Sequence, residues 1–260
     1  MKIIVLTENH AGGHYGAEHG LSYFIESKEF KLLFDTGHSD LFLKNAAKGG
    51  INLENEIDTI ALSHGHWDHG NGLQNITGKK LICHPDAFMK RYRKGGVENI
   101  GLDNTRYFYD NSFDLMESRD PVEIYPGVFF LGEIPRKNDF ESQLTSFIDE
   151  SGNPDFIPDD SALAIISDTK LAVISGCAHA GIVNIVEYAR EVSQIHELKL
   201  VIGGFHLKHK NLQTEKTVEF FEKNRPEILI PSHCTDLPAL SMFHDKFKSP
   251  LLKTGDVINF

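Results

Sequence analysis

The stretch Ser63-His64-Gly65-His66-Trp67-Asp68-His69-Gly70 places three imidazoles and one carboxylate within six residues. It directly follows the apolar run 57–62, whose pattern predicts a buried strand. The donor side chains therefore leave a rigid strand end and enter a loop flanked by glycines, which is a favourable anchor for a site. Imidazole and carboxylate donors suit Zn, Fe(II), Mn or Co. The stretch predicts a metal site; the alternative is a histidine-rich surface loop.

Length and composition indicate one large α/β or α+β domain over residues 1–260. The chain has 26 Lys and Arg against 37 Asp and Glu, a net charge of −11. Such acidity gives little attraction to nucleic acid, so no nucleic-acid partner is expected. No apolar run approaches a membrane span, so we expect no membrane partner and a cytoplasmic location. The odd number of cysteines, Cys83, Cys177 and Cys234, does not suggest a disulfide framework.

Four apolar strands are predicted to end in histidine-bearing loops. They carry His64 and its neighbours, His179, His206 and His233. A lone histidine at a strand end is more often a packed residue, but four such ends favour one shared pocket, because open sheets bind ligands beyond the carboxyl ends of their strands.

Two segments, at about 93–120 and 132–160, show no clean periodicity and are predicted to be irregular. Long irregular segments in a compact domain are more often lids or substrate loops than linkers. We therefore expect them to form the walls of a pocket for a small-molecule substrate.

The pattern His64-x-His66-x-Asp68-His69 after an apolar strand resembles the signature of the metallo-β-lactamase superfamily. Phe34-Asp35-Thr36-Gly37 is similar to the first motif of that superfamily, in which the aspartate supports the metal loop. The resemblance extends over essentially the whole chain. It implies an α+β fold, an αββα sandwich of two mixed β-sheets packed face to face with helices on the outer faces.

Further blocks resemble the subgroup named for dihydropterin-aminobenzene-ribofuranosyl phosphate synthase. The blocks are 17–22, 132–136, 175–181, 203–207 and 232–235. The subgroup's named enzyme joins a dihydropterin to an aminobenzene ribosyl phosphate.

The resemblance implies two divalent metal ions, Zn first and Fe or Mn as alternatives. His64 and His66 match ligands of the first ion, and Asp68 and His69 match ligands of the second. His233 matches the C-terminal histidine that completes the second site.

The chain departs from the superfamily in one block. There is no histidine between residues 85 and 178 to match the usual third histidine ligand, and Cys177 stands where the bridging aspartate is usual. His179 is the nearest candidate for the missing histidine. Whether Cys177 is also a ligand or a small buried residue stays open, and with it the number and identity of the metals.

Three further residues are assigned to the pocket. His206 is expected to contact substrate or to act as a general acid, and His19 belongs to an early loop suited to cover the metals. Arg136 is able to bind a phosphate or carboxylate with two hydrogen bonds; the alternative is a solvated arginine.

The leading functional prediction is a metal-dependent hydrolase that uses a metal-bound hydroxide on an ester, amide or phosphoester of a small molecule. Asp68 would hold the metal and orient this water, and His206 would protonate the leaving group. The first alternative is a synthase that transfers a pterin and releases pyrophosphate. A di-iron redox protein and a non-catalytic ligand sensor are the alternatives from other classes. The sequence does not define the oligomeric state.

Overall fold

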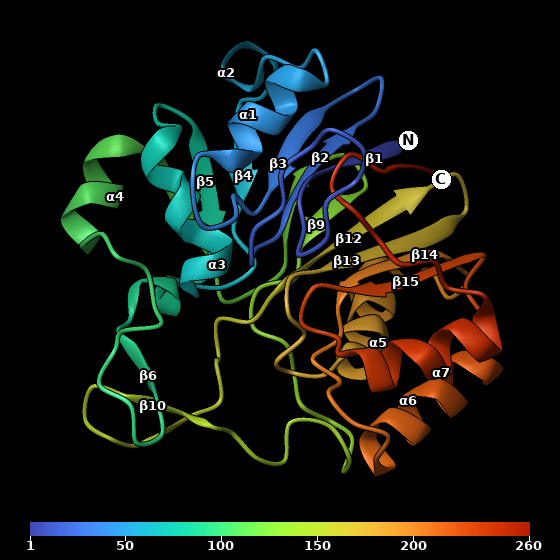
Figure 1. Ribbon diagram of the computed structural model, residues 1–260. Helices are drawn as coiled ribbons and strands as arrows, with labels where there is room; N and C mark the ends of the chain where they lie inside the picture. The colour runs from blue at the N-terminus through green and yellow to red at the C-terminus, as the bar shows by residue number, and fades with distance from the viewer. The chain divides into compact units, whose positions relative to one another are not determined.

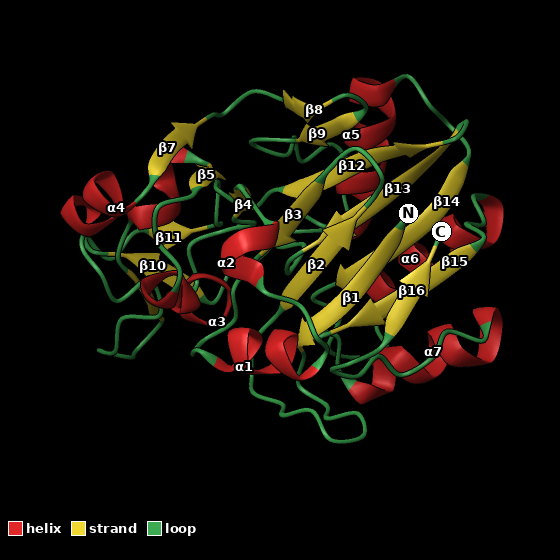
Figure 2. Ribbon diagram, turned by 90° about the horizontal axis from the view of Figure 1, so that it is seen from above, coloured by secondary structure: helices red, strands yellow, loops and turns green.

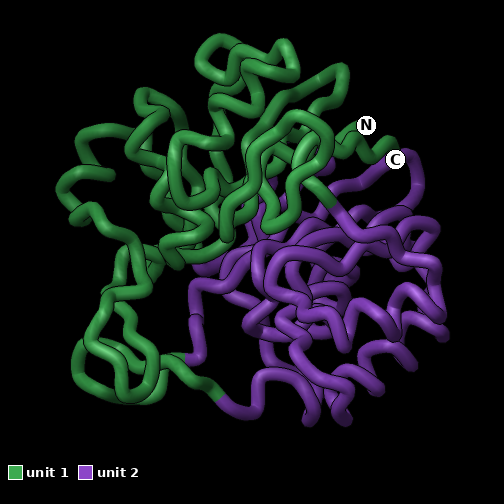
Figure 3. Tube along the Cα trace, viewed as in Figure 1, with its two compact units in different colours: residues 1–118, 145–155, 253–259 green, residues 119–144, 156–252, 260 purple.

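The computed structural model describes all residues 1–260, and Figures 1 and 2 show its helices and strands. The chain divides into two compact units, which Figure 3 shows in different colours. Unit 1 comprises residues 1–118, 145–155 and 253–259. Unit 2 comprises residues 119–144, 156–252 and 260. Each main β-sheet lies within one unit, so the two are described in turn.

Unit 1 is built on a seven-stranded mixed sheet of order β16-β1-β2-β3-β4-β5-β7. Strands β16, β1, β2 and β3 pair antiparallel, whereas β3, β4, β5 and β7 pair in parallel. In Figure 2 the strands β1, β2 and β3 lie side by side, with β16 at the edge. Their bounds are β1 (Lys2–Thr7), β2 (Ser22–Glu26), β3 (Lys31–Phe34), β4 (Thr59–Ala61), β5 (Lys80–Cys83), β7 (Asp114–Glu117) and β16 (Val257–Asn259).

Short helices cover the sheet of unit 1 and share its hydrophobic core. Phe42 and Ala46, one helical turn apart, pack in the same cluster as Leu33 and Ile60 of the sheet. Tyr109 is also fully buried in this cluster. The helices are α1 (Leu41–Lys48), α2 (Leu53–Glu56), α3 (Trp67–Gly70), α4 (Arg106–Ser112) and the 3₁₀ helices η1 (Asn71–Asn75) and η2 (Pro85–Phe88).

A small sheet of order β11-β10-β6 completes unit 1. Its strands are β6 (Arg91–Arg93), β10 (Phe147–Asp149) and β11 (Pro154–Asp155). The fully buried Arg91 donates from Nε to Asp155 at 2.8 Å, which pairs two charges that would be costly to bury alone.

Unit 2 is built on a six-stranded mixed sheet of order β15-β14-β13-β12-β9-β8. Strands β13, β14 and β15 are parallel neighbours, so their carboxyl ends share one edge. The other pairs are antiparallel. The bounds are β8 (Val122–Tyr125), β9 (Val128–Phe130), β12 (Ala162–Ser167), β13 (Lys170–Ser175), β14 (Leu198–Gly204) and β15 (Ile228–Ser232).

Three helices pack against the sheet of unit 2: α5 (Ile182–Ser193), α6 (Leu212–Lys223) and α7 (Leu237–Phe247). In α5, Ile182, Ile185, Val186 and Ala189 recur at helical spacing and enter the same core as the sheet. The first turn is capped by Glu141, which accepts hydrogen bonds from the backbone of Val183 and Asn184. Burial raises the pKa of Glu141, although these bonds act in the opposite direction.

The predicted α+β class with two mixed sheets and helices is confirmed. One prediction is corrected in part. The segment 93–120, expected to be irregular, contains α4 and β7. Strand β7 is stabilised by parallel pairing with β5, and Arg106 of α4 forms ion pairs with Asp110 and Glu117. Cross-strand pairing and ion pairs of this kind leave no sequence periodicity. The segment 132–160 is irregular apart from β10 and β11.

The lid role of these segments and the single domain over 1–260 stay predictions. None of the helices is both long enough and apolar enough to span a membrane.

Candidate metal centre

The donor residues of unit 1 lie on a loop that follows β4 and enters α3. His64 and His69 are fully buried, and His66 and Asp68 are 6% and 7% exposed. Gly65 has no space for a side chain, because a Cβ there would lie 1.7 Å from the carbonyl oxygen of Ala87. The sequence therefore needs glycine at this position for the loop to close onto its neighbour.

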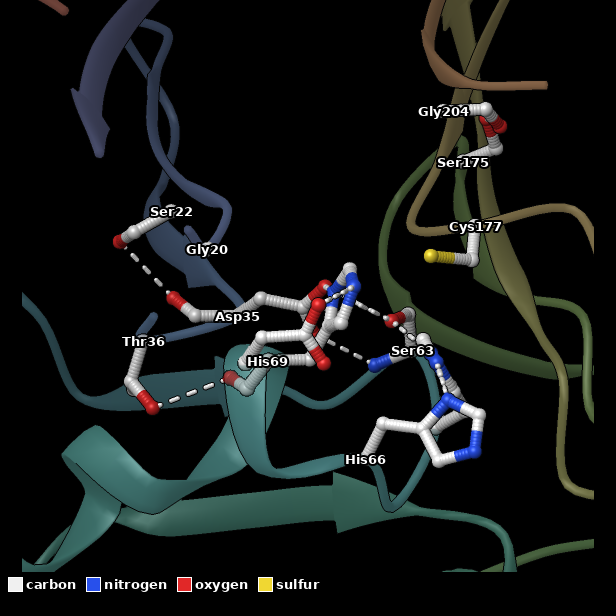
Figure 4. A network of polar contacts seen from close by, with 12 residues as sticks. Gly20, Ser22, Asp35, Thr36, Ser63, His66, His69, Ser175, Cys177 and Gly204 are labelled. Carbon is white, nitrogen blue, oxygen red and sulfur yellow. Dashed lines mark hydrogen bonds and ion pairs between the residues drawn. The ribbon is translucent and has the colours of Figure 1, made fainter. Parts of the chain in front are cut away.

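Asp35 is the residue that holds this loop. It follows β3 with φ of 57°, a left-handed conformation that aspartate tolerates better than most residues. Its fully buried carboxylate accepts hydrogen bonds at 2.7 Å from the backbone N–H and the hydroxyl of Ser63. It also lies 2.7 Å from Nδ1 of His69 (Figure 4). The role in supporting the metal loop that the sequence assigned to Asp35 is consistent with these contacts.

The Asp35–His69 contact assigns the imidazole tautomer, because a carboxylate accepts and Nδ1 must donate. Nε2 of His69 then presents its lone pair to a ligand. A carboxylate behind a histidine is the usual support of metal-binding histidines in proteins. Thr36 fixes the same residue from its backbone side, since its N–H and hydroxyl both donate to the carbonyl of His69 at 2.8 and 3.1 Å.

His64 and His66 are brought together at the start of the loop. Nε2 of His64 lies 2.9 Å from Nδ1 of His66, and Nδ1 of His64 lies 2.9 Å from the hydroxyl of Ser63. The His66 ring also packs against Phe147, with ring centroids 5.1 Å apart. Two convergent imidazole nitrogens in a buried setting fit the donor chemistry of zinc.

Asp68 is held by an early loop. Its Oδ2 lies 3.2 Å from Nε2 of His19 and 3.9 Å from Nε2 of His69. Its carbonyl accepts from the backbone N–H of Leu21, and a Cβ on Gly20 would lie 2.9 Å from that carbonyl oxygen. The structure thus brings His19 to the carboxylate of Asp68, and the donors of unit 1 fit a divalent metal.

In unit 2, the parallel strands β13, β14 and β15 deliver the other predicted residues to one sheet edge. Left-handed backbone follows each strand, at Ala178 (φ 53°), His206 (φ 50°) and His233 (φ 52°). Such conformations cost on the order of 1–3 kcal/mol each and cluster at functional sites. The rings of His179 and His206 lie 4.4 Å apart. The edge therefore carries strain at two residues that the sequence selected, His206 and His233, and at Ala178, the neighbour of the third, His179.

Two thiols lie at the same edge as His206. The ligand atoms of Cys177, His206 and Cys234 all lie within 4.8 Å of one another. Burial raises the pKa of the Cys234 thiol, but interactions with the side chains of Cys177 and His206 outweigh burial and hold that pKa well below its ordinary value. None of the three cysteines of the chain is in a disulfide.

The loop that carries His179 is held by a buried carboxylate. Oδ2 of Asp160 accepts from the backbone N–H of Ala180 at 2.8 Å. Burial raises the pKa of Asp160 to about 7, against this hydrogen bond and the nearby charge of Arg136.

Arg136 lies within unit 2 with its guanidinium engaged by its own unit. Nε donates to the hydroxyl of Ser142 at 3.0 Å, and Nη2 donates to the carbonyls of Phe156 and Ile157. These contacts tie together the two ends of the segment predicted to be irregular. The expected role in substrate binding stays a prediction.

Several supporting residues were not found from the sequence. The contacts of Ser63 with Asp35 and of Thr36 with His69 each span more than 25 positions, and such contacts carry no periodic signal. Cys234 had one available signal, because it directly follows His233 at a predicted strand end.

A model of the metallo-β-lactamase superfamily matches residues 15–86, which include the Asp35 motif and the histidine loop. Over its full length the chain is 32% identical to the 7,8-dihydropterin-6-methyl-4-(β-D-ribofuranosyl)-aminobenzene-5'-phosphate synthase of Methanocaldococcus jannaschii, of which it covers 97%. It is 33% identical to the uncharacterized protein MJ0448 of the same organism, with 92% of each chain covered.

A solved structure described as Tm1679, a metal-dependent hydrolase of the β-lactamase superfamily, is 30% identical to the chain. The alignment covers 100% of this chain and 99% of the other, with a TM-score of 0.88. The chain therefore belongs to the metallo-β-lactamase superfamily, in the family that includes the M. jannaschii dihydropterin synthase.

Proposed function

We propose that this protein is a metal-dependent hydrolase acting on an ester, amide or phosphoester of a small molecule. Two divalent ions, zinc in the first instance, serve the reaction. The proposed ligands are His64, His66 and His179 for one ion and Asp68, His69 and His233 for the other. This grouping follows from the motifs along the sequence and from the family, and Cys177 is a further candidate ligand.

The observation that carries the proposal is the buried contact of Asp35 with His69 and Ser63 in unit 1. A packed protein gains little from burying a carboxylate against the imidazole of His69 for stability alone, because burial of charge is costly. The arrangement instead fixes one tautomer and one orientation of His69. Fixed ligands that are themselves supported from behind are what a metal centre requires.

When bound, such ions supply Lewis acidity and lower the pKa of a water molecule at the site. The chain's own residues supply orientation. Asp35 holds His69 through Nδ1, and His19 holds Oδ2 of Asp68. We expect the other oxygen of Asp68 to accept a hydrogen bond from the attacking group. Since 54% of the His19 side chain is exposed, it also offers the incoming substrate an imidazole contact.

A second candidate is a synthase that transfers a pterin methylene to an aryl nucleophile and releases pyrophosphate. It is favoured by the full-length similarity to the M. jannaschii synthase. The two candidates share the metals and the leaving-group chemistry, and they differ in whether water or an aryl compound attacks.

The metal dependence is tested on the purified full-length protein by metal analysis and by hydrolysis of nitrophenyl esters and phosphodiesters. Chelation should abolish turnover, and Zn²⁺ or Mn²⁺ should restore it. His66→Ala should bind less metal than the wild type and lose activity. His196→Ala removes an exposed histidine and is the matched control that should change neither. Full turnover by metal-free protein would contradict the proposal.

The two candidates are separated with a dihydropterin methyl diphosphate, in the presence and absence of an aminobenzene ribosyl phosphate. Product analysis by mass spectrometry identifies the attacking group. A hydroxymethyl pterin formed at the same rate with and without the aryl compound supports the hydrolase. A coupled product whose formation requires the aryl compound supports the synthase instead.

A further inference from the structure

Unit 2 contains a donor cluster that the histidine motif does not include. Its members are Cys177 after β13, His206 after β14 and Cys234 after β15. Their sulfur and nitrogen ligand atoms all lie within 4.8 Å of one another. Three strand ends thus contribute one soft or borderline donor each, and the cluster lies within a single compact unit.

The parallel register of the sheet aligns the ends of the three strands that precede the donors. Ser175 pairs with Gly203, and Gly204 pairs with Ser232, so the three strands end side by side. Ser175 reinforces this end, because its hydroxyl donates to the carbonyl of Gly204 at 3.0 Å. Each donor lies two residues beyond the end of its strand, so the register of the sheet sets where the three loops begin.

Gly204 is the position that admits the second thiol. A Cβ at Gly204 would lie 2.5 Å from Sγ of Cys234 and 3.2 Å from Cα of Cys177. Any other residue would push these two cysteines apart. Sγ of Cys234 lies 3.4 Å from the carbonyl oxygen of Cys177, so this contact joins the loops after β13 and β15. His206 adopts its left-handed conformation at the same edge.

The spacing suits a tetrahedral ion. Zinc with Zn–S bonds of about 2.3 Å and Zn–N bonds of about 2.0 Å separates its ligand atoms by roughly 3.5–3.8 Å. The three ligand atoms all lie within 4.8 Å of one another, a range that includes this geometry. Thiolates select zinc and other soft ions over magnesium, calcium or manganese.

We propose that Cys177, His206 and Cys234 form a thiolate-containing binding site for a zinc-like divalent cation within unit 2. The site uses His206 as a ligand rather than as the proton donor that the sequence suggested. Binding forms one nitrogen and two sulfur bonds to the ion and releases the thiol protons to solvent. The fourth coordination position stays open to water or to a substrate group. The proposal goes beyond the proposed function and does not depend on it.

The test replaces the native metal of the full-length protein with Co²⁺, whose thiolate complexes give an intense near-ultraviolet charge-transfer band. The wild type should show this band. Cys234→Ser and Cys177→Ser should each lose about half of it, and His206→Gln should weaken Co²⁺ binding. Cys83→Ser is the matched control, because Cys83 is a buried cysteine in β5 of unit 1. It should leave the band unchanged.

Alkylation followed by mass spectrometry gives a second readout that needs no variant to fold. Zn²⁺ should protect Cys177 and Cys234 of the wild type from iodoacetamide. The proposal is overturned if cobalt binds without a charge-transfer band, if Cys234→Ser keeps the full band, or if zinc leaves the modification of both cysteines unchanged.

Failure of this site is distinguishable from failure of the proposed function. His66→Ala removes a donor of unit 1 and should abolish hydrolysis while the charge-transfer band persists. A band that disappears in His66→Ala would show that the thiols bind no ion of their own, and would overturn the inference even where hydrolysis is metal-dependent.

Discussion

Asp35→Asn tests how the histidine loop is organised. The substitution keeps the size of the side chain and leaves one oxygen to accept from the backbone N–H of Ser63. It replaces the other oxygen with an NH₂ group that faces Nδ1 of His69 and the hydroxyl of Ser63. Two donors then meet at 2.7 Å, so His69 relieves the conflict by moving its proton to Nε2. That nitrogen is the one available for a metal.

The size of the effect follows from the hydrogen bonds that the substitution removes. Partners that support a metal-binding histidine are worth about 10–100-fold in metal affinity, or ~1.4–2.7 kcal/mol. Metal-free protein should also lose stability, because hydrogen bonds to a charged group contribute roughly 1.5–3 kcal/mol each. In Asp35→Asn, the hydrogen bonds with the Ser63 hydroxyl and with Nδ1 of His69 are replaced by contacts between two donors. We therefore expect a loss of about 2–4 kcal/mol in the free energy of unfolding.

Zinc affinity is measured by competition with a chromophoric chelator, and stability by urea denaturation of the metal-free protein. Nitrogen-15 NMR of the imidazoles identifies the tautomer of His69. Asp155→Asn is the matched control, since this buried carboxylate pairs with Arg91 instead of a histidine. It should lose stability but keep its zinc affinity. Wild-type zinc affinity together with an unchanged His69 tautomer in Asp35→Asn would refute the reasoning.

Three further results are expected. Gly65→Ala should destabilise the protein by roughly 3–5 kcal/mol in thermal denaturation, because the added Cβ would meet the carbonyl of Ala87. The control is Gly96→Ala, whose Cβ would lie 3.3 Å from the carbonyl oxygen of Arg93, and it should cost under about 1 kcal/mol. The hydrogen bonds of two lysines hold the pKa of Glu227 down at about 2, so its carboxyl should still be ionised at pH 3 in an NMR titration. Because that folded pKa is depressed, the stabilisation is present above the ordinary value of 4.5 and is lost as pH falls toward 2, and a midpoint near 4.5 would contradict the pairing. Arg136→Gln should lose about 1–3 kcal/mol of stability through its carbonyl contacts, and a change confined to KM would instead establish its role in substrate binding.

Much of the fold and part of the centre were predictable from the sequence because their signals are local. Apolar runs indicated the strands that end in histidine-bearing loops. Donor residues packed into the loop after β4 indicated the histidine cluster directly. By contrast, β7 and α4 were missed, since pairing with β5 and the ion pairs of Arg106 carry no periodic pattern.

The sequence alone determined that the Ser63–Gly70 stretch can bind a metal, because its imidazole and carboxylate donors and their spacing lie within consecutive residues. Tertiary structure decided how these donors are held. Asp35 reaches Ser63 and His69 only because β3 and β4 pair in parallel and end together. The same reason applies in unit 2, where Cys234 meets Cys177 across 57 positions because β13, β14 and β15 share one register. Contacts between strand ends depend on pairing, and pairing is a property of the folded sheet.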